Sequence, residues 1–242
     1  MKKKLALKSI EICFTGDIIR LTKKASVARP VPFLLFKIYF NKEANMEFSV
    51  FYCKLSRGLG LRTSQGITDR SCVIRTFTAD SFESAVLNCT EIREDIKRYK
   101  RIPVILVEYL EEPTYTTVVN ELAEYQRIVE GTIDIVECVD LSGLDIICND
   151  DGKILKLPLN RALTSEHNCY DIVAGNMIIT ETNEDGDTVG ISLDNAVKAH
   201  SHFIDPEIFI LNDSDNSVEV MTCSHEMGRI MKLNFIPNIS LK

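Results

Sequence analysis

The pattern of apolar and polar positions along this chain predicts mainly β-structure. Residues 48–55 and 72–78 alternate between apolar and polar side chains, and Phe, Val, Tyr, Ile and Thr are prominent in both segments. Other alternating segments and short apolar runs predict further strands at 104–109, 132–139, 144–149, 153–157, 172–180, 188–192, 208–211 and 217–221. We therefore expect β-sheet to form the centre of the fold.

Three segments have the pattern of helices. The first should begin at Asp80 as its N-cap and run to about Lys100, with acidic residues early and basic residues late, as the helix dipole prefers. A second helix is expected over 118–129, with Gly131 at its C-cap, and a short third helix over 194–202. Apolar residues at a spacing of three and four indicate that each of the first two buries one face.

Glycine and proline predict the connections between these elements. Segments 58–60 and 150–152 should form turns, the second as a hairpin turn into the strand at 153–157. Pro158 fixes a bend in the LPLNR segment that follows. Gly175, inside the apolar run 172–180, is expected to allow a close approach of backbone within a strand.

Together these elements predict an α+β protein. Residues 46–101 should form a small N-terminal strand-strand-helix lobe, and residues 102–203 a mixed β-sheet domain with one or two helices. Residues 204–242 are expected to form a β-rich C-terminal extension.

The first 45 residues differ from the rest of the chain. They carry ten Lys or Arg against three Asp or Glu and show no clear helical or strand period. The codons for Lys42 to Met46 can spell a purine-rich bacterial ribosome-binding site just ahead of an ATG. We therefore expect Met46 to be the natural start and residues 1–45 to be upstream sequence read in frame. A genuine basic arm is the alternative.

Charge and cysteine content narrow the classes of function. Residues 102–242 carry eight basic and 25 acidic residues, which argues against direct binding of nucleic acid. A local acidic patch that imitates phosphates stays open. Eight scattered cysteines without a CxxC pair indicate reduced, mostly buried thiols, as in a bacterial cytoplasmic protein. The apolar stretch 31–40 is far shorter than the ~20 residues of a membrane-spanning helix, so we expect no membrane segment.

Six blocks of sequence carry a family resemblance. They are IPVILVEY, ELAEYQRIVEGTIDIVEC, LDIICNDDGK, LPLNR, DIVAGNMIIT and NEDGDTVGISLD, which follow one another between residues 102 and 203. In this order they resemble a domain-of-unknown-function family of phages, plasmids and integrative elements of Gram-positive bacteria. The family brings no known activity, so the resemblance implies a setting, that of a small accessory gene product of a mobile element.

The LPLNR segment supplies the candidate ligand-binding residues. Asn160 and Arg161 follow the bend, and the planar fork of an arginine suits a carboxylate or phosphate. Asp171 lies ten residues further on and completes the set. The alternative is a structural ion pair between Arg161 and Asp171 that locks the bend.

Two pairs of histidine and cysteine are weak candidates for a metal site. His167 with Cys169, and Cys223 with His225, are each two residues apart. This spacing is shorter than in the usual structural zinc pairs, so we expect no metal and no cofactor.

We therefore expect a non-catalytic accessory protein of a mobile element that binds a host protein or a small anionic ligand, in counter-defence or host modulation. The alternative is an enzyme that processes a small molecule or nucleotide with Arg161 and the His/Cys cluster. The sequence leaves the oligomeric state open.

Overall fold

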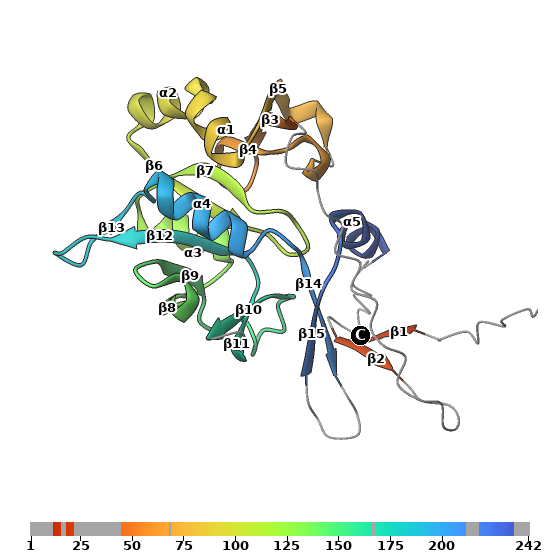
Figure 1. Ribbon diagram of the computed structural model, residues 1–242. Helices are drawn as coiled ribbons and strands as arrows, with labels where there is room; N and C mark the ends of the chain where they lie inside the picture. The colour runs from red at the N-terminus through yellow and green to blue at the C-terminus, as the bar shows by residue number, and fades with distance from the viewer. Residues whose placement is uncertain are drawn as a thin grey trace, which may run out of the picture.

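The computed structural model describes residues 12–15, 18–21, 45–67, 69–165, 168–211 and 218–234 (Figure 1). A nine-stranded sheet forms the centre of this part of the chain. Its strands are β3 (Met46–Cys53), β4 (Gly58–Thr63), β5 (Val73–Ala79), β6 (Arg101–Val107), β7 (Thr114–Val119), β8 (Ile133–Glu137), β9 (Asp145–Asn149), β12 (Met177–Thr182) and β13 (Thr188–Val189). They lie in the order β5-β3-β4-β7-β6-β12-β9-β8, and β13 pairs with β12.

Neighbouring strands of this sheet run antiparallel. The α+β class is confirmed, but the expected mixed sheet is wrong. Three neighbouring pairs, β3 with β4, β6 with β7 and β8 with β9, are joined by short connections. A short connection permits only antiparallel pairing, because a parallel pair needs a crossover of a dozen or more residues.

Residues 46–101, expected to form a small lobe, contribute three strands to this same sheet. β4 pairs with β7 through Gly60 opposite Thr116 and Leu61 opposite Tyr115. The sheet is therefore continuous from the first segment into the rest of the chain (Figure 1).

Helices cover both faces of the sheet. They are α1 (Phe82–Asn88), α2 (Thr90–Tyr99), α3 (Leu122–Val129) and α4 (Leu193–His202). Apolar residues of α1, α2 and α4 pack into one core cluster with Phe48, Leu61 and Ile105. Residues of α3 pack into a second cluster with Val104, Leu106 and Ile178. Since Val104 and Leu106 alternate with Ile105 along β6, the two clusters lie on opposite faces.

The first predicted helix is divided in two. Ser81, not Asp80, is the N-cap of α1, and its side chain accepts a hydrogen bond from the backbone N–H of Ser84 at 3.0 Å. Cys89 then leaves the helical conformation at φ −85° and ψ 87° before α2 begins. Despite the break, Ala85, Cys89 and Ile92 lie in the same core cluster.

The predicted turn at 58–60 is in fact the start of β4. A Cβ atom on Gly58 would lie 2.5 Å from Thr117 Oγ1, and one on Gly60 would lie 2.9 Å from Thr114 Cγ2. Both glycines are needed because the side chains of β7 approach this backbone closely.

The expected helix over 118–129 is correct only from Leu122 onward. Residues 114–119 form β7, whose sequence TYTTVV consists of β-branched and aromatic residues that favour strands. The chain leaves the sheet at Asn120, and α3 begins after Glu121, its N-cap.

A separate hairpin lies beside the main sheet (Figure 1). Its strands are β10 (Leu159–Ser165) and β11 (Asn168–Ala174), so most of the LPLNR segment is strand. The predicted strand at 153–157 is instead a series of turns. Gly175, at φ 88°, separates β11 from β12 and allows the chain to pass from the hairpin into the main sheet.

The C-terminal part forms another sheet with the first described residues. β14 (Glu207–Leu211) pairs with β15 (Val218–Thr222) and, in parallel, with β2 (Ile18–Leu21), which pairs with β1 (Ile12–Thr15). Helix α5 (His225–Asn234), which the sequence pattern missed, follows. The start-site hypothesis concerns residues 1–45, most of which lie outside the described residues. None of the helices in the described segments combines the length and apolar character that crossing a membrane requires.

Candidate functional site

Arg161 lies on β10 with its side chain completely buried. Its Nη2 donates to the carbonyl oxygens of Glu111 at 2.8 Å and Phe203 at 3.2 Å, and its Nη1 to the backbone and side-chain oxygens of Asn160, both at 3.0 Å. Burial lowers the pKa of this guanidinium to about 10, so the group is still charged at neutral pH. Arg161 therefore joins the hairpin to the β6–β7 loop and to the end of α4.

The other two predicted ligand-binding residues lie in different environments. Asn160 is fully buried, and its Nδ2 donates to the carbonyl oxygens of Val107 at 2.9 Å and Gly175 at 2.8 Å. Asp171 is exposed and forms an ion pair with Lys153. The expected ion pair between Arg161 and Asp171 is not formed.

The register of the hairpin explains this separation. Arg161 lies opposite Val173, whereas Asp171 lies opposite Leu163. Sequence separation alone could not give this register, which depends on how two strands pair.

Of the four His and Cys residues named as weak metal candidates, three lie within the described residues. His167 lies outside the described residues. The Sγ of the exposed Cys169 donates to the carbonyl of Asp171 at 3.3 Å, and Nε2 of His225 lies 2.8 Å from the carbonyl oxygen of Ile204. Burial raises the pKa of Cys223. In the described part of the chain no three His, Cys, Asp or Glu side chains are grouped to hold a metal ion.

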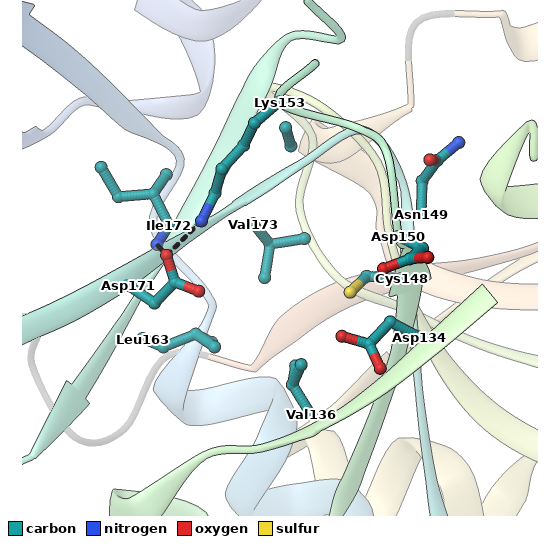
Figure 2. A pocket seen from close by; sticks show the side chains of 11 residues that line it. Asp134, Val136, Cys148, Asn149, Asp150, Lys153, Leu163, Asp171, Ile172 and Val173 are labelled. Atoms are coloured by element: carbon teal, nitrogen blue, oxygen red, sulfur yellow. Dashed lines mark hydrogen bonds and ion pairs between the residues drawn. The ribbon is translucent and has the colours of Figure 1, made fainter. Parts of the chain in front are cut away.

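A small cleft of about 80 Å³ lies between the β8–β9 strands and the β10–β11 hairpin (Figure 2). The carboxylates of Asp134, Asp150 and Asp171 line it, together with the ammonium of Lys153 and the thiol of Cys148. Burial raises the pKa of Cys148 to about 11, so this thiol stays protonated at neutral pH and is a poor nucleophile. The charge of Lys153 is already paired with Asp171 (Figure 2).

Residues 150–156 form an exposed turn beside this cleft, which we call the Ile154 turn. Ile154 is 78% exposed and Leu155 is 57% exposed, although both are aliphatic. The turn is held by backbone hydrogen bonds from Leu155 N to Asp151 O at 2.8 Å and from Leu157 N to Gly152 O at 2.9 Å. The two aliphatic side chains are thus presented to solvent by an ordered backbone.

A second group of polar residues is buried at the β6–β7 loop. Nη1 of Arg62 contacts Glu111 Oε2 at 2.9 Å, and its Nε donates to Thr114 Oγ1 at 2.8 Å. Glu112 is 1% exposed and accepts from the hydroxyl of Thr63. The sequence signal for this group is two glutamates before a proline between apolar strands, a pattern that by itself predicts only a turn.

His200 of α4 completes this buried group. Its ring stacks on Phe82 at a centroid distance of 3.7 Å, and its Nε2 lies 3.5 Å from Glu112 Oε1, an ion-pair distance without hydrogen-bond geometry. Burial alone would raise the pKa of Glu112, but the neighbouring His200 and Thr63 outweigh it and hold this pKa below its usual range. The group joins β4, the β6–β7 loop and α4.

Residues 100–204 match the model of one protein family, Domain of unknown function (DUF3846). This part of the chain is therefore similar to that family, and we call residues 100–204 the DUF3846 domain. The DUF3846 domain extends from β6 to the end of α4 and includes Asn160, Arg161, Asp171 and the Ile154 turn. Comparison with curated proteins and with solved structures gave no match.

The DUF3846 domain shares its sheet with residues outside the family match. Arg62 on β4 lies outside the domain and forms an ion pair with Glu111 inside it. Residues 46–99 therefore complete the polar group at the β6–β7 loop and extend the sheet of the DUF3846 domain.

Proposed function

We propose that this protein is a non-catalytic accessory protein of a mobile genetic element, which binds a host protein in counter-defence or host modulation. The observation that carries this proposal is the Ile154 turn, with its two exposed aliphatic side chains beside a carboxylate-lined cleft. The mobile-element setting rests on the sequence resemblance.

An exposed aliphatic pair of this kind is typical of a contact with another protein. Burying an aliphatic side chain is favourable by about 1.5–3 kcal/mol, so Ile154 and Leu155 would gain from entering an apolar pocket. The hydrogen bonds of the turn order its backbone before binding, which lowers the entropy lost on association.

The surroundings of the turn indicate the chemistry of the partner. Asp150 and Asp151 lie within the turn together with Lys153 and Lys156, and Asp171 in the neighbouring cleft is paired with Lys153. A partner with an apolar pocket bordered by both basic and acidic residues would complement this surface.

The environment of Arg161 gives less support to two alternatives, the binding of a small anionic ligand and an enzymatic function. Its guanidinium is buried, and its nitrogen atoms already donate to carbonyl oxygens of Glu111, Phe203 and Asn160. Binding an anion there would require these hydrogen bonds to break. The protein-binding function is therefore the one we retain.

The test uses the full chain as bait in host lysate, with two matched variants. Leu155→Asp changes the turn, whereas Leu122→Asp changes a leucine on α3 with the same exposure of 57%. A protein retained by the wild type and by Leu122→Asp, but lost with Leu155→Asp, should then bind purified chain in a saturable manner. Equal retention by all three proteins would contradict a role for the turn.

A further inference from the structure

The main path of the nine-stranded sheet ends in two outer strands, and their free edges differ; the two-residue β13 lies off this path and pairs with β12. β5 and β8 stand at opposite ends of the strand order. An outer strand presents backbone N–H and C=O groups that can pair with another chain unless the protein blocks them.

The free edge of β8 is blocked by side chains. The backbone N–H of Ile135 donates to its neighbour Asp134 at 2.9 Å, and the hydroxyl of Tyr170 on β11 donates to the carbonyl oxygen of Glu137 at 2.7 Å. Residues 135 and 137 point their backbone groups to the same side of the strand. A further strand would have to displace both contacts.

The free edge of β5 has no such block among the residues that the structure describes. The backbone of β5 is bonded there only to β3. The strand is seven residues long, contains no proline or lysine, and is rich in residues that favour strands. Its pairing with β3 shifts register at Ile74, so the regular part of the strand runs from Arg75 to Ala79. Ile74 is 58% exposed, and Thr76 and Thr78 are also exposed.

We infer that β5 pairs antiparallel with β5 of a second copy of this chain, so that the two sheets continue into each other across a twofold axis. The inference concerns a different surface from the Ile154 turn and does not depend on the proposed function.

The sequence of β5 favours one register of this pairing. If Thr76 lies on the twofold axis opposite Thr76 of the second copy, the centre of the pairing falls in the regular part of the strand, and the irregular residue Ile74 lies near its end. Arg75 then lies opposite Phe77, and Ile74 opposite Thr78, each from the other copy. A twofold axis at Arg75 would instead place two like charges opposite each other, which is unfavourable.

Charge also favours a second copy over an unrelated strand. Arg75 is the single charged residue of β5, and it is already paired with Glu91 at 2.7 Å and lies over the ring of Phe77 at 4.5 Å. The strand therefore offers no unpaired charge by which a foreign strand could be selected. Its own threonine and β-branched residues match each other across the axis.

The test measures the mass of the full chain in solution by light scattering during size-exclusion chromatography. We expect the wild type to show twice the chain mass at high concentration. Thr76→Lys and Thr76→Glu should each be monomeric, because each places two like charges on the twofold axis. An equal mixture of the two variants should recover the dimer, since lysine then faces glutamate.

Matched controls separate this result from misfolding. Circular dichroism should show that both Thr76 variants keep the wild-type secondary structure, because Thr76 is exposed. Ile135→Lys, at the blocked edge of β8, should leave the dimer intact. A monomeric wild type, a dimer that survives Thr76→Lys, or a mixture that stays monomeric would each overturn the inference.

Discussion

Buried charges hold separate segments of this protein together at the scale of single residues. Arg161 contacts the β6–β7 loop and the end of α4, and Arg62 contacts the same loop from β4. Their partners are mainly backbone carbonyls and buried carboxylates. Removing one partner of such a buried hydrogen bond lowers the stability of the fold, because no water takes the place of the missing group.

Replacing Arg161 should therefore destabilise the fold. Arg161→Ala leaves the carbonyl oxygens of Glu111 and Phe203 without their donor and opens a cavity, so we expect a loss of about 3–5 kcal/mol in the free energy of unfolding. Asp171→Asn removes only a surface ion pair and should cost about 0–1 kcal/mol. Urea unfolding followed by circular dichroism measures both. Similar stabilities for the two variants would contradict a structural role for Arg161.

Glu112 should make stability depend on pH. Its pKa in the folded protein lies below its usual range, so its contribution is complete above the unfolded value of about 4.3 and is lost as the pH falls through the folded value. Between about pH 5 and pH 3, the wild type should therefore lose more stability than Glu112→Gln. The exposed Glu184→Gln is the control and should follow the wild type. Parallel curves for the wild type and Glu112→Gln would refute this role.

At the scale of secondary-structure elements, two glycines with a left-handed backbone conformation lie in connections between strands. Gly175 has φ 88°, and a Cβ atom there would lie 2.9 Å from Leu157 Cδ1. Gly143 has a similar φ of 85° but nothing within 4 Å of the corresponding position. The two glycines thus share the backbone conformation and differ in packing.

This difference predicts unequal costs for the two alanine variants. Gly143→Ala should destabilise by about 1–2 kcal/mol through the left-handed conformation alone. Gly175→Ala should cost more, because the side chain of Leu157 must also shift away from the new methyl group. Thermal or urea unfolding of both variants provides the comparison. A smaller cost for Gly175→Ala would show that the junction between β11 and β12 adapts without strain.

At the scale of the whole molecule, one sheet unites the DUF3846 domain with the strands that precede it. β4 outside the domain pairs with β7 inside it, and the core cluster on the α4 face includes residues from both parts. No disulfide links the two parts through the cysteines whose side chains the structure describes. These free cysteines are Cys53, Cys72, Cys89, Cys138, Cys148, Cys169 and Cys223.

The melting temperature should therefore be unchanged by a reducing agent. The stability of the described part comes from the sheet and its two core clusters, neither of which is sensitive to reduction. Thermal unfolding with and without dithiothreitol makes the comparison. A destabilisation by reductant of about 2–5 kcal/mol, the usual cost of losing a disulfide, would contradict this prediction.

The sequence by itself determined the elements whose signal is local. The strands near 48–55 and 72–78, the helix at 194–202 and the strands at 208–211 and 217–221 all appear close to their predicted bounds. Their periodicity arises from hydrogen bonds and burial within a few neighbouring residues, so a short window contains the information.

Tertiary structure decided what depends on distant segments. In the sequence, Gly58 and Gly60 predict a turn. In the folded protein they lie in a strand, where the absence of a side chain makes room for the side chains of β7. Arg161 looks accessible until the β6–β7 loop and α4 supply carbonyl oxygens around it. Strand order and register bring together residues far apart in the chain, and a local pattern does not specify which of them will meet.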